Sequence, residues 1–375
     1  MTAPIYLDYQ ATTPLAPEVA AAMRPWLETN FANPHSPHRI GREAAAAIEV
    51  AREQLAAALG ADGGSLYFTS GATEAANWAL KGAAAQLPPG KRRIVTFATE
   101  HAAVLDTAGW LGQQGCDVEI LDVSADGTAV MDEVAKRITP ETGMVAAMLV
   151  NNEIGVVHPI AEMAALARRR GALFFCDAVQ GFGRVALELG DCDMVAVSAH
   201  KIHGPKGIGA LWVREGVSLE PLLHGGGQEG GLRSGTLSPA LCVGFGEAAR
   251  LLSEHAQSDA AHVERLWSIA LDRLAAWEVN GSIEARYKGN LNVHRRGIDA
   301  ARLFSEIRSV AFSAGSACAS GSGRPSHVLS ALTRDALVAS SSIRLGFGRY
   351  TSEAELVDAL DRIDRAAERQ LGGRA

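Results

Sequence analysis

Short apolar runs alternate with helical stretches through the first two thirds of this chain, and this alternation constrains the fold more than any other feature. Strands are predicted at 66–69, 93–98, 118–123, 144–150, 172–176, 194–198 and 209–213. Helices are predicted at 36–60, 74–81, 102–114, 131–137 and 160–170. The first of these helices has Pro37 in its first turn and Gly60 at its end, and the second ends at Gly82. Apolar strands that alternate with helices indicate an α/β fold with a mostly parallel sheet covered on both faces.

The pattern changes after about residue 235. Two long helices are predicted at 239–255 and 260–277, and a strand near 290–294 follows. A helix near 299–308, a Ser/Gly-rich loop, a strand near 342–347 and a helix at 352–370 complete the chain. This arrangement predicts a second, smaller α+β domain. We expect a large domain at 15–250 and a small domain made of 1–14 and 251–375.

Composition and charge exclude several classes of protein. The 375 residues carry a net charge of −7, which lacks the basic surplus of proteins that hold nucleic-acid phosphates. Hydrophobic residues make up 47% and charged residues 21%, which is typical of a globular protein and not of a disordered one. No apolar run reaches the roughly 18–20 residues that cross a bilayer, and no secretory signal opens the chain. We expect a cytoplasmic protein that binds neither DNA nor a membrane.

The cysteines indicate no structural framework. Five are scattered along the chain, and none forms a C-x-x-C pair. This spacing predicts neither a disulfide scaffold nor a zinc site, and no metal is expected. Cys116, Cys192 and Cys242 are interpreted as structural or incidental, and Cys176 lies on a predicted strand.

Polar residues follow several predicted strands, where ligands bind in parallel sheets. TSGATE at 69–74 is a glycine-containing turn that opens a helix, and the free backbone N–H groups of such a turn suit phosphate. Asp177 ends an apolar strand and is either the partner of a protonated pyridine nitrogen or the cap of a helix. His101 follows another strand and is either catalytic or structural.

Lysine is scarce, and two of the six lysines lie close together. Arginine supplies the other 29 positive charges, a bias that genomic base composition explains. Lys201 and Lys206 both lie in HKIHGPKG at 200–207, directly after a strand. A lysine that forms a Schiff base needs a desolvated, positively charged setting that lowers its pKa, and the alternative is a solvated basic loop. Together with the other strand ends, this segment fits pyridoxal 5′-phosphate.

Nine segments of the sequence resemble the NifS/IscS-type cysteine desulfurases of the class V aminotransferase family. They are YLDYQATTP (6–14), TSGATE (69–74), TEH (99–101), VNNEIGV (150–156), DAVQ (177–180), HKIHGPKGIG (200–209), HGGG (224–227), RSGT (233–236) and SAGSAC (313–318). They occur in the order of the family, and the resemblance runs from residue 5 to about residue 350. It implies the fold-type I architecture of pyridoxal-phosphate transferases, with a mostly parallel seven-stranded sheet flanked by helices. It also implies a homodimer with active sites at the subunit interface.

The resemblance assigns roles around the cofactor to the matching residues. Lys201, and not Lys206, is the implied Schiff-base lysine. His101 is expected to stack on the pyridine ring and to serve in acid–base steps. Asp177 is expected to pair with the ring nitrogen, and Gln180 to bond the phenolic oxygen.

Further residues are assigned to the phosphate, the cofactor site and the substrate. The phosphate is expected to be held by Ala72, Thr73, Ser198, His200 and, from the other subunit, Thr236. Asn152 is expected to line the cofactor site. Arg344 is expected to clamp the substrate carboxylate with help from Asn33, since arginine binds carboxylates through two parallel hydrogen bonds.

Cys318 lies among small residues at 313–326, which predict a mobile, extended loop. The resemblance makes it the nucleophile that accepts sulfur. The implied reaction converts L-cysteine to L-alanine and leaves an enzyme-bound persulfide. A sulfur-acceptor protein, either an iron–sulfur scaffold or another sulfur carrier, is the implied partner. The alternatives are a selenocysteine lyase, a small-amino-acid aminotransferase, or a non-catalytic sulfur carrier of the same fold.

The sequence departs from the usual pattern of the family at a few positions. Gln10 replaces a common serine, and Gln228 and Gly230 stand where histidine and arginine are often found. None of these changes removes a proposed catalytic group.

Overall fold

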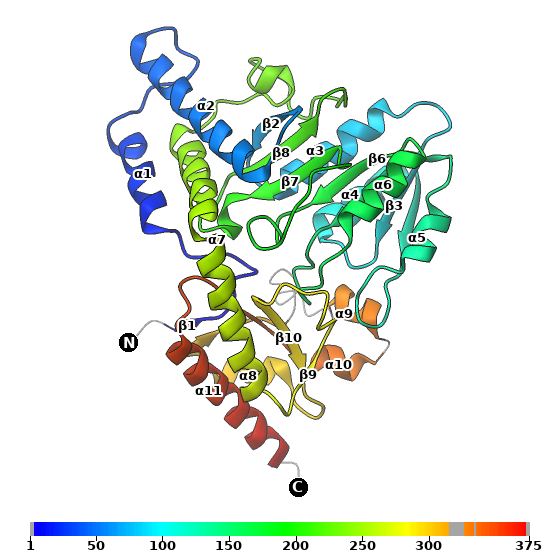
Figure 1. Cartoon of the computed structure of the whole chain (residues 1–375), viewed down its shortest axis with the longest axis vertical. Coiled ribbons are helices and arrows are strands. Elements are labelled where there is room, and N and C mark those ends of the chain that lie inside the picture. Colours follow the sequence, from blue (N-terminus) through cyan, green and yellow to red (C-terminus); the bar gives the residue numbers. More distant parts are fainter. Residues whose placement is uncertain (1–3, 315–325, 334, 373–375) are drawn as a thin grey trace.

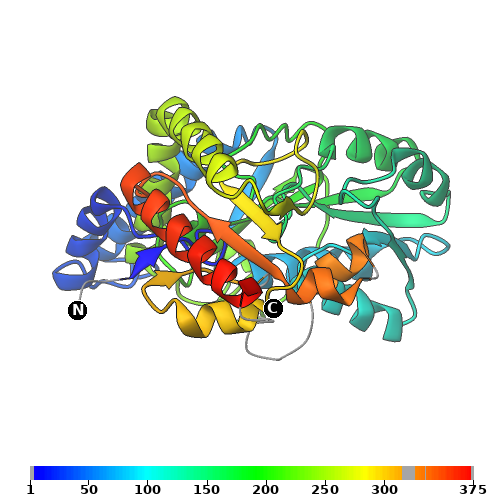
Figure 2. The same ribbon diagram turned by 90° about the horizontal axis from the view of Figure 1, so that it is seen from below.

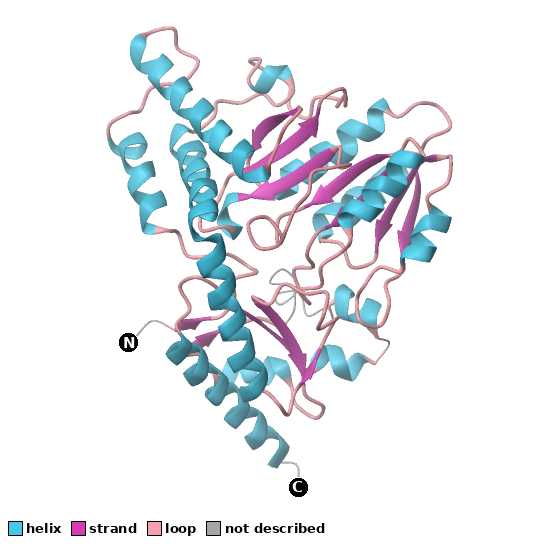
Figure 3. Cartoon of the chain, viewed as in Figure 1, coloured by secondary structure: helices cyan, strands magenta, loops and turns pink. Residues whose placement is uncertain are grey.

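A seven-stranded sheet forms the centre of the larger part of the molecule (Figure 1, Figure 3). The computed structural model describes residues 4–314, 326–333 and 335–372. Across the sheet, the strands are β2 (Gly64–Thr69), β8 (Gly209–Arg214), β7 (Met194–Ser198), β6 (Leu173–Asp177), β5 (Thr142–Met148), β3 (Arg93–Phe97) and β4 (Asp117–Leu121). β8 runs antiparallel to both of its neighbours, and the other adjacent pairs are parallel. The predicted mostly parallel sheet is therefore confirmed.

Helices cover both faces of this sheet. The helices of one layer are α3 (Ala72–Gln86) and α4 (Ala102–Gln113). The helices on the other side are α1 (Pro17–Glu28), α2 (Arg39–Leu59), α5 (Met131–Arg137), α6 (Ile160–Arg169) and the first half of α7 (Pro239–Arg273). Side chains of β7 alternate between the two layers: Met194 packs in the cluster under α3 and α4, and Val195 packs in the cluster on the opposite face. This alternation explains why the strands read as continuous apolar runs.

A smaller unit is built on a second, antiparallel sheet. Its strands are β12 (Ser342–Gly346), β10 (Asn290–His294) and β9 (Glu278–Val279). α8 (Ala300–Glu306), α11 (Glu353–Gly372) and the second half of α7 cover it through a separate hydrophobic cluster. Figure 2 shows α11 alongside α7. Four shorter elements complete this part: β1 (Ile5–Tyr6), β11 (Val310–Ala311), α9 (His327–Leu332) and α10 (Ala336–Ser340).

α7 links the two units as a single helix. The prediction of two helices in this region was wrong, because α7 continues without interruption from Pro239 to Arg273. The four residues between the predicted helices include neither glycine nor proline, so nothing in the backbone stops the helix. Leu251 of α7 packs in the larger core and Leu266 in the smaller one. The predicted domain boundary at residue 250 lies within this helix, and the division into domains stays a prediction.

Two predicted helix ends were wrong. α2 does end before Gly60, which adopts a left-handed conformation (φ 64°), but it begins at Arg39 with His38 as its cap, and Pro37 precedes it. α3 continues through Gly82 to Gln86. Gly82 packs against the chain around Glu220, since an added Cβ would lie 2.9 Å from the Glu220 carbonyl oxygen. The glycine therefore serves close packing and not helix termination.

The N-terminal segment joins the smaller unit to the larger one. β1 pairs in parallel with β11, and Asp8 forms a bridge with Gly346 at the end of β12. The chain then crosses to η1 (Ala199–Lys201), where the N–H of Thr13 donates to the His200 carbonyl at 2.9 Å. Among the described residues, no helix combines the length and apolar character needed to cross a membrane.

The close packing at Gly82 predicts that Gly82→Ala destabilises the protein by about 1–3 kcal/mol, although alanine is the better helix former. Gly109→Ala in α4 is the matched control, because nothing lies within 4 Å of a Cβ added there. We expect that control to keep or raise the thermal midpoint, while Gly82→Ala lowers it. Equal midpoints for the two variants would contradict the packing role.

Candidate active site

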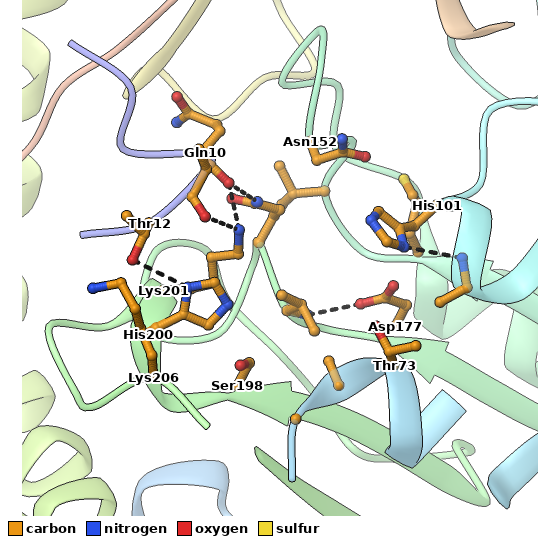
Figure 4. A pocket seen from close by; sticks show the side chains of 18 of the residues that line it. Gln10, Thr12, Thr73, His101, Asn152, Asp177, Ser198, His200, Lys201 and Lys206 are labelled. Atoms are coloured by element: carbon orange, nitrogen blue, oxygen red, sulfur yellow. Dashed lines mark hydrogen bonds between the residues drawn. The ribbon is translucent and has the colours of Figure 1, made fainter. Parts of the chain in front are cut away.

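A cavity of about 560 Å³ opens at the carboxyl ends of the parallel strands. Its lining includes Met148, Asp177 and Ser198, the last residues of β5, β6 and β7, as well as His101 after β3. Figure 4 shows His101, Asn152, Asp177 and Lys201 gathered around this hollow. Ten of the predicted site residues line it: Ala72, Thr73, His101, Asn152, Asp177, Gln180, Ser198, His200, Lys201 and Arg344.

Three predicted site residues are not placed in this cavity. Asn33 is exposed in the loop between α1 and α2, where its Oδ1 accepts a hydrogen bond from the His35 N–H at 2.9 Å. Thr236 is exposed in the loop before α7. Cys318 lies outside the described residues. The four other cysteines are buried, as expected for structural thiols.

Lys201 ends η1, directly after β7, and its ammonium group lies inside the cavity. Nζ donates to the carbonyl oxygens of Gln10 at 2.5 Å and Ala11 at 2.8 Å. Burial lowers the pKa of Lys201 to about 7, and the positive charges of Arg184 and Arg344 act in the same direction. The solvated basic loop considered from the sequence is therefore wrong for Lys201.

Asp177 lies at the end of β6 with its carboxyl group buried. Oδ1 accepts the N–H of Val179 at 3.0 Å. Burial raises the pKa of this carboxyl, whereas His101 and Lys201 oppose the rise. The chain goes from Asp177 to β7 through turns with no helix among these described residues, so the helix-cap interpretation is wrong. A buried carboxyl group facing a cavity needs a cationic or hydrogen-bonding partner there.

His101 caps α4, and this contact determines which ring nitrogen carries the proton when the imidazole is neutral. Its Nδ1 accepts the N–H of Ala103 at 3.1 Å. When the ring is neutral, its proton is consequently on Nε2, because the acceptor nitrogen must keep its lone pair. His101 thus combines a structural contact on one nitrogen with a second nitrogen that can exchange a proton.

The start of α3 lies on the cavity wall. Residues 70–73 line the cavity, and the helix begins after Gly71 without a side-chain cap. The N-terminus of this 15-residue helix therefore presents backbone N–H groups and the positive end of its dipole. Gly209 permits this turn to come close, since a Cβ there would lie 2.7 Å from the Gly71 carbonyl carbon.

His200 lies in η1, two residues after Ser198, and its imidazole ring is neutral at neutral pH. Burial lowers its pKa to about 4, with contributions from Lys201, Lys206 and Arg184. Its Nδ1 lies 3.2 Å from the Thr12 hydroxyl oxygen. A neutral imidazole with one nitrogen occupied can offer a hydrogen bond from the other to an anion beside Ser198.

Arg344 of β12 brings a guanidinium group from the smaller unit into the cavity. Only 1% of the residue is exposed. Nη2 donates to Asp8 Oδ1 at 2.8 Å, and Nη1 donates to the Asn152 carbonyl at 3.0 Å. These two contacts fix the plane of the guanidinium, as a carboxylate-binding arginine requires.

Gln180 lies between the N-terminal segment and Arg184. Its Nε2 donates to the Gln10 carbonyl at 2.9 Å, and its Oε1 accepts from Arg184 Nη1 at 2.7 Å. Arg184 Nη2 also donates to the Lys201 carbonyl at 2.6 Å. Arg184 therefore supports two cavity residues, a role that the sequence did not reveal because a lone arginine after a strand carries no distinctive pattern.

Glu100 is a buried acid that sequence reasoning also missed. One of its oxygens accepts the Met148 N–H at 2.9 Å, and the other has no partner among the described residues. Burial raises its pKa well above the usual value, and the charge of Asp177 adds to the rise. Its backbone carbonyl lies 2.9 Å from His327 Nε2 at the start of α9. The place of Glu100 directly before His101 in the sequence was the only available signal.

The raised pKa of Glu100 predicts a distinct pH dependence for Glu100→Gln. The folded protein keeps a proton that the unfolded chain loses above about pH 4.5, so this group's contribution to stability falls as the pH rises. Glutamine keeps the acceptor for Met148 and does not titrate. We expect the variant to gain stability relative to the unmodified protein between pH 5 and pH 8. Urea unfolding at both pH values measures this difference, and a difference that is constant with pH contradicts it.

The lowered pKa of Lys201 predicts selective reactivity. In the protein without cofactor, acetylation of Lys201 should be half-maximal near pH 7, as measured by mass spectrometry of its peptide. Arg184→Gln removes a positive charge that lowers this pKa and should move the midpoint upward. A midpoint near pH 10 in the unmodified protein would contradict the buried setting.

Comparisons with known proteins agree with this geometry. The family model described as aminotransferase class-V matches residues 5–360. A mitochondrial cysteine desulfurase from Eremothecium gossypii is 45% identical, with 98% of this chain and 76% of that protein covered. A cysteine desulfurase IscS from Rickettsia akari is 43% identical over 97% of this chain and 91% of that protein.

Solved structures show the same likeness. A NifS-like protein superposes with a TM-score of 0.90 at 33% identity, covering 97% of this chain and 99% of that chain. A structure of SspA in complex with cysteine superposes with a TM-score of 0.83 at 36% identity, covering 93% of this chain and all of that chain (100%). The chain belongs to the aminotransferase class-V family and, within it, to the NifS/IscS-type cysteine desulfurases.

Proposed function

We propose that this protein is a pyridoxal-phosphate-dependent enzyme that converts L-cysteine to L-alanine and transfers the sulfur to Cys318. The observation that carries the proposal is the meeting of Lys201, Asp177 and Arg344 in one cavity. An amine of lowered pKa, a buried acid and a buried guanidinium are the groups required to bind the cofactor and an amino acid together.

The cavity residues fit the cofactor. Asp177 offers a buried carboxyl for the pyridine nitrogen, and the N-terminus of α3 with Ser198 and His200 suits the phosphate. Gln180 and Asn152 line the same cavity, in positions that support contacts to the ring substituents. Bound through Lys201, pyridoxal 5′-phosphate supplies an electron sink for the bonds to the substrate Cα.

Arg344 is the group that holds the substrate. Within the part of the chain that the structure describes, its guanidinium has two engaged N–H groups and three remaining donors, which suffice for a carboxylate bound by two hydrogen bonds. With its pKa near 7, the Lys201 amine can accept the Cα proton at neutral pH and return it to the substrate. His101 Nε2 is the second group suited to proton transfer.

Cys318 takes the sulfur in the proposed reaction. Its thiolate attacks the substrate sulfur, a sulfur–sulfur bond forms, and the bond between Cβ and sulfur breaks. The electron pair of the broken bond passes to the substrate carbon, where a proton completes the methyl group of alanine. The persulfide then passes to an acceptor protein, an iron–sulfur scaffold or another sulfur carrier.

A homodimer would give roles to two residues that lie outside the cavity of their own chain. Asn33 and Thr236 are both exposed, and each has an exposed apolar neighbour in its loop. Near Asn33, the side chain of Phe31 is 87% exposed. Near Thr236, Leu223 is also exposed, and its carbonyl accepts the Ser234 N–H at 3.0 Å. A second copy that covers these side chains would receive Thr236 at its cofactor phosphate, and Asn33 is expected to help Arg344 hold the substrate carboxylate.

Cys318→Ala tests the proposed sulfur transfer. The variant should bind L-cysteine, as seen by the change in cofactor absorbance, but lose at least about 100-fold of its alanine and sulfide production, because no nucleophile remains. Cys242→Ala is the matched control. Burial raises the pKa of Cys242 to about 12, so this thiol is unreactive and its removal should leave turnover intact.

The same assay separates the alternative reactions. Turnover of L-cysteine at the original rate by Cys318→Ala would contradict the persulfide route and favour direct elimination. Alanine formation that requires an α-keto acid would instead indicate an aminotransferase. Activity restricted to selenocysteine would indicate a lyase for that substrate.

A further inference from the structure

The N-terminal segment from Asp8 to Thr13 runs beside the cavity, and its middle residues, Gln10, Ala11 and Thr12, line it. Gln10 and Ala11 offer their carbonyls to Lys201, and Thr12 contacts His200. Asp8 contacts Arg344. Asp8 is the one member of the segment that brings a charge to the group expected to hold the substrate.

The contact between Asp8 and Arg344 is fixed from both sides. Asp8 Oδ1 lies 2.8 Å from Arg344 Nη2, and the side chains are 17% and 2% exposed. The Asp8 backbone forms a bridge with Gly346 of the same strand as Arg344, and its carbonyl accepts the Tyr6 hydroxyl at 3.0 Å. These two backbone contacts fix the Asp8 main chain beside the strand that carries Arg344, and the ion pair itself holds the carboxylate against the guanidinium.

Asp8 leaves the guanidinium able to bind a ligand. Nη2 and Nη1 each use one N–H, for Asp8 and for the Asn152 carbonyl, and Nε has no partner among the described residues. Three donors therefore remain for a ligand carboxylate. What Asp8 changes is the charge, since a buried cation with a permanent anionic neighbour attracts a second negative charge less strongly.

The other charged groups around the cavity show why the neutralisation of Arg344 by Asp8 affects ligand binding. Lys201 and Lys206 line the cavity together with Arg344, and among the described lining residues the acids are Asp177 and Glu74. Glu74 is already paired with Arg233 at 2.6 Å. Asp177 lies at the end of β6, on the side of His101. Asp8 is therefore the acid that directly opposes the positive charge at the end of the cavity where Arg344 lies.

We propose that Asp8 is a positioning and specificity-determining residue, which makes the site select amino acids with a single carboxylate over those with a second anionic group. A side-chain anion on the ligand would lie within a few ångströms of the bound α-carboxylate and so close to Asp8. Repulsion over such distances, at the dielectric of a protein surface, is sufficient for about a tenfold discrimination. This inference rests on the proposed function, because it assumes that Arg344 binds the substrate carboxylate.

The test compares two ligands that release no sulfur. L-alanine carries one carboxylate and L-aspartate carries two. Their dissociation constants are measured on the holoenzyme by calorimetry and by cofactor absorbance. Asp8→Asn keeps the acceptor oxygen and the volume but removes the charge. We expect it to raise the affinity for aspartate relative to alanine by about tenfold or more.

Asp8→Glu is the rescue variant. It retains the charge, so it should keep the original preference for alanine even if both ligands bind more weakly. A merely structural role would change the two affinities in parallel in both variants. If the ratio of the two affinities in Asp8→Asn stays within twofold of the original, the proposal is wrong.

Turnover of L-cysteine by the unmodified holoenzyme is measured alongside and separates a failure of the Asp8 role from a failure of the proposed function. If the unmodified enzyme is active but Asp8→Asn leaves the ratio of the aspartate and alanine affinities unchanged, only the role of Asp8 is refuted. An enzyme that produces neither alanine nor sulfide from L-cysteine would refute the proposed function itself.

Discussion

Burying a lysine amine beside arginines is the constraint on which the rest of this site depends. Lys201 ends η1, directly after β7, and burial together with the positive charges of Arg184 and Arg344 lowers its pKa to about 7. Such an amine is stable only where hydrogen-bond acceptors replace water. The carbonyls of Gln10 and Ala11 are these acceptors. The position of the N-terminal segment is therefore as essential to the lysine as the strand that carries it.

The same segment explains how two separate hydrophobic cores produce one cavity. The large sheet brings Asp177, Ser198 and Lys201 to a common edge because parallel strands end on the same side. Arg344 comes from the small sheet, and Asp8 and Asn152 hold it at the cavity. α7, which packs in both cores, keeps the two sheets in fixed relation. A guanidinium placed in this way can bind a carboxylate only while both units are folded.

Local ion pairs balance the charges in and beside the cavity, whatever the net charge of the protein. Asp8 opposes Arg344, and Glu74 opposes Arg233 at the start of α3. His200 stays neutral through burial and its cationic neighbours, and burial likewise favours the protonated form of Glu100. Burial and neighbouring charges thus set the protonation states that proton transfer needs. The net charge of −7 gives no information about this local balance.

The sequence alone predicted the alternating strands and helices and the mostly parallel sheet, because apolar periodicity is a local pattern. The resemblance of its motifs to those of a known family added ten residues that line the cavity. The sequence did not predict the continuous α7, the packing role of Gly82, or the parts played by Asp8, Arg184 and Glu100. These depend on neighbours that are distant in the chain: Glu220 for Gly82, Arg344 for Asp8, Met148 for Glu100. Residue types and their order determined which chemistry the chain can perform. Only the tertiary structure decided which charges meet and which are desolvated, because burial and Coulomb interactions are properties of positions in space.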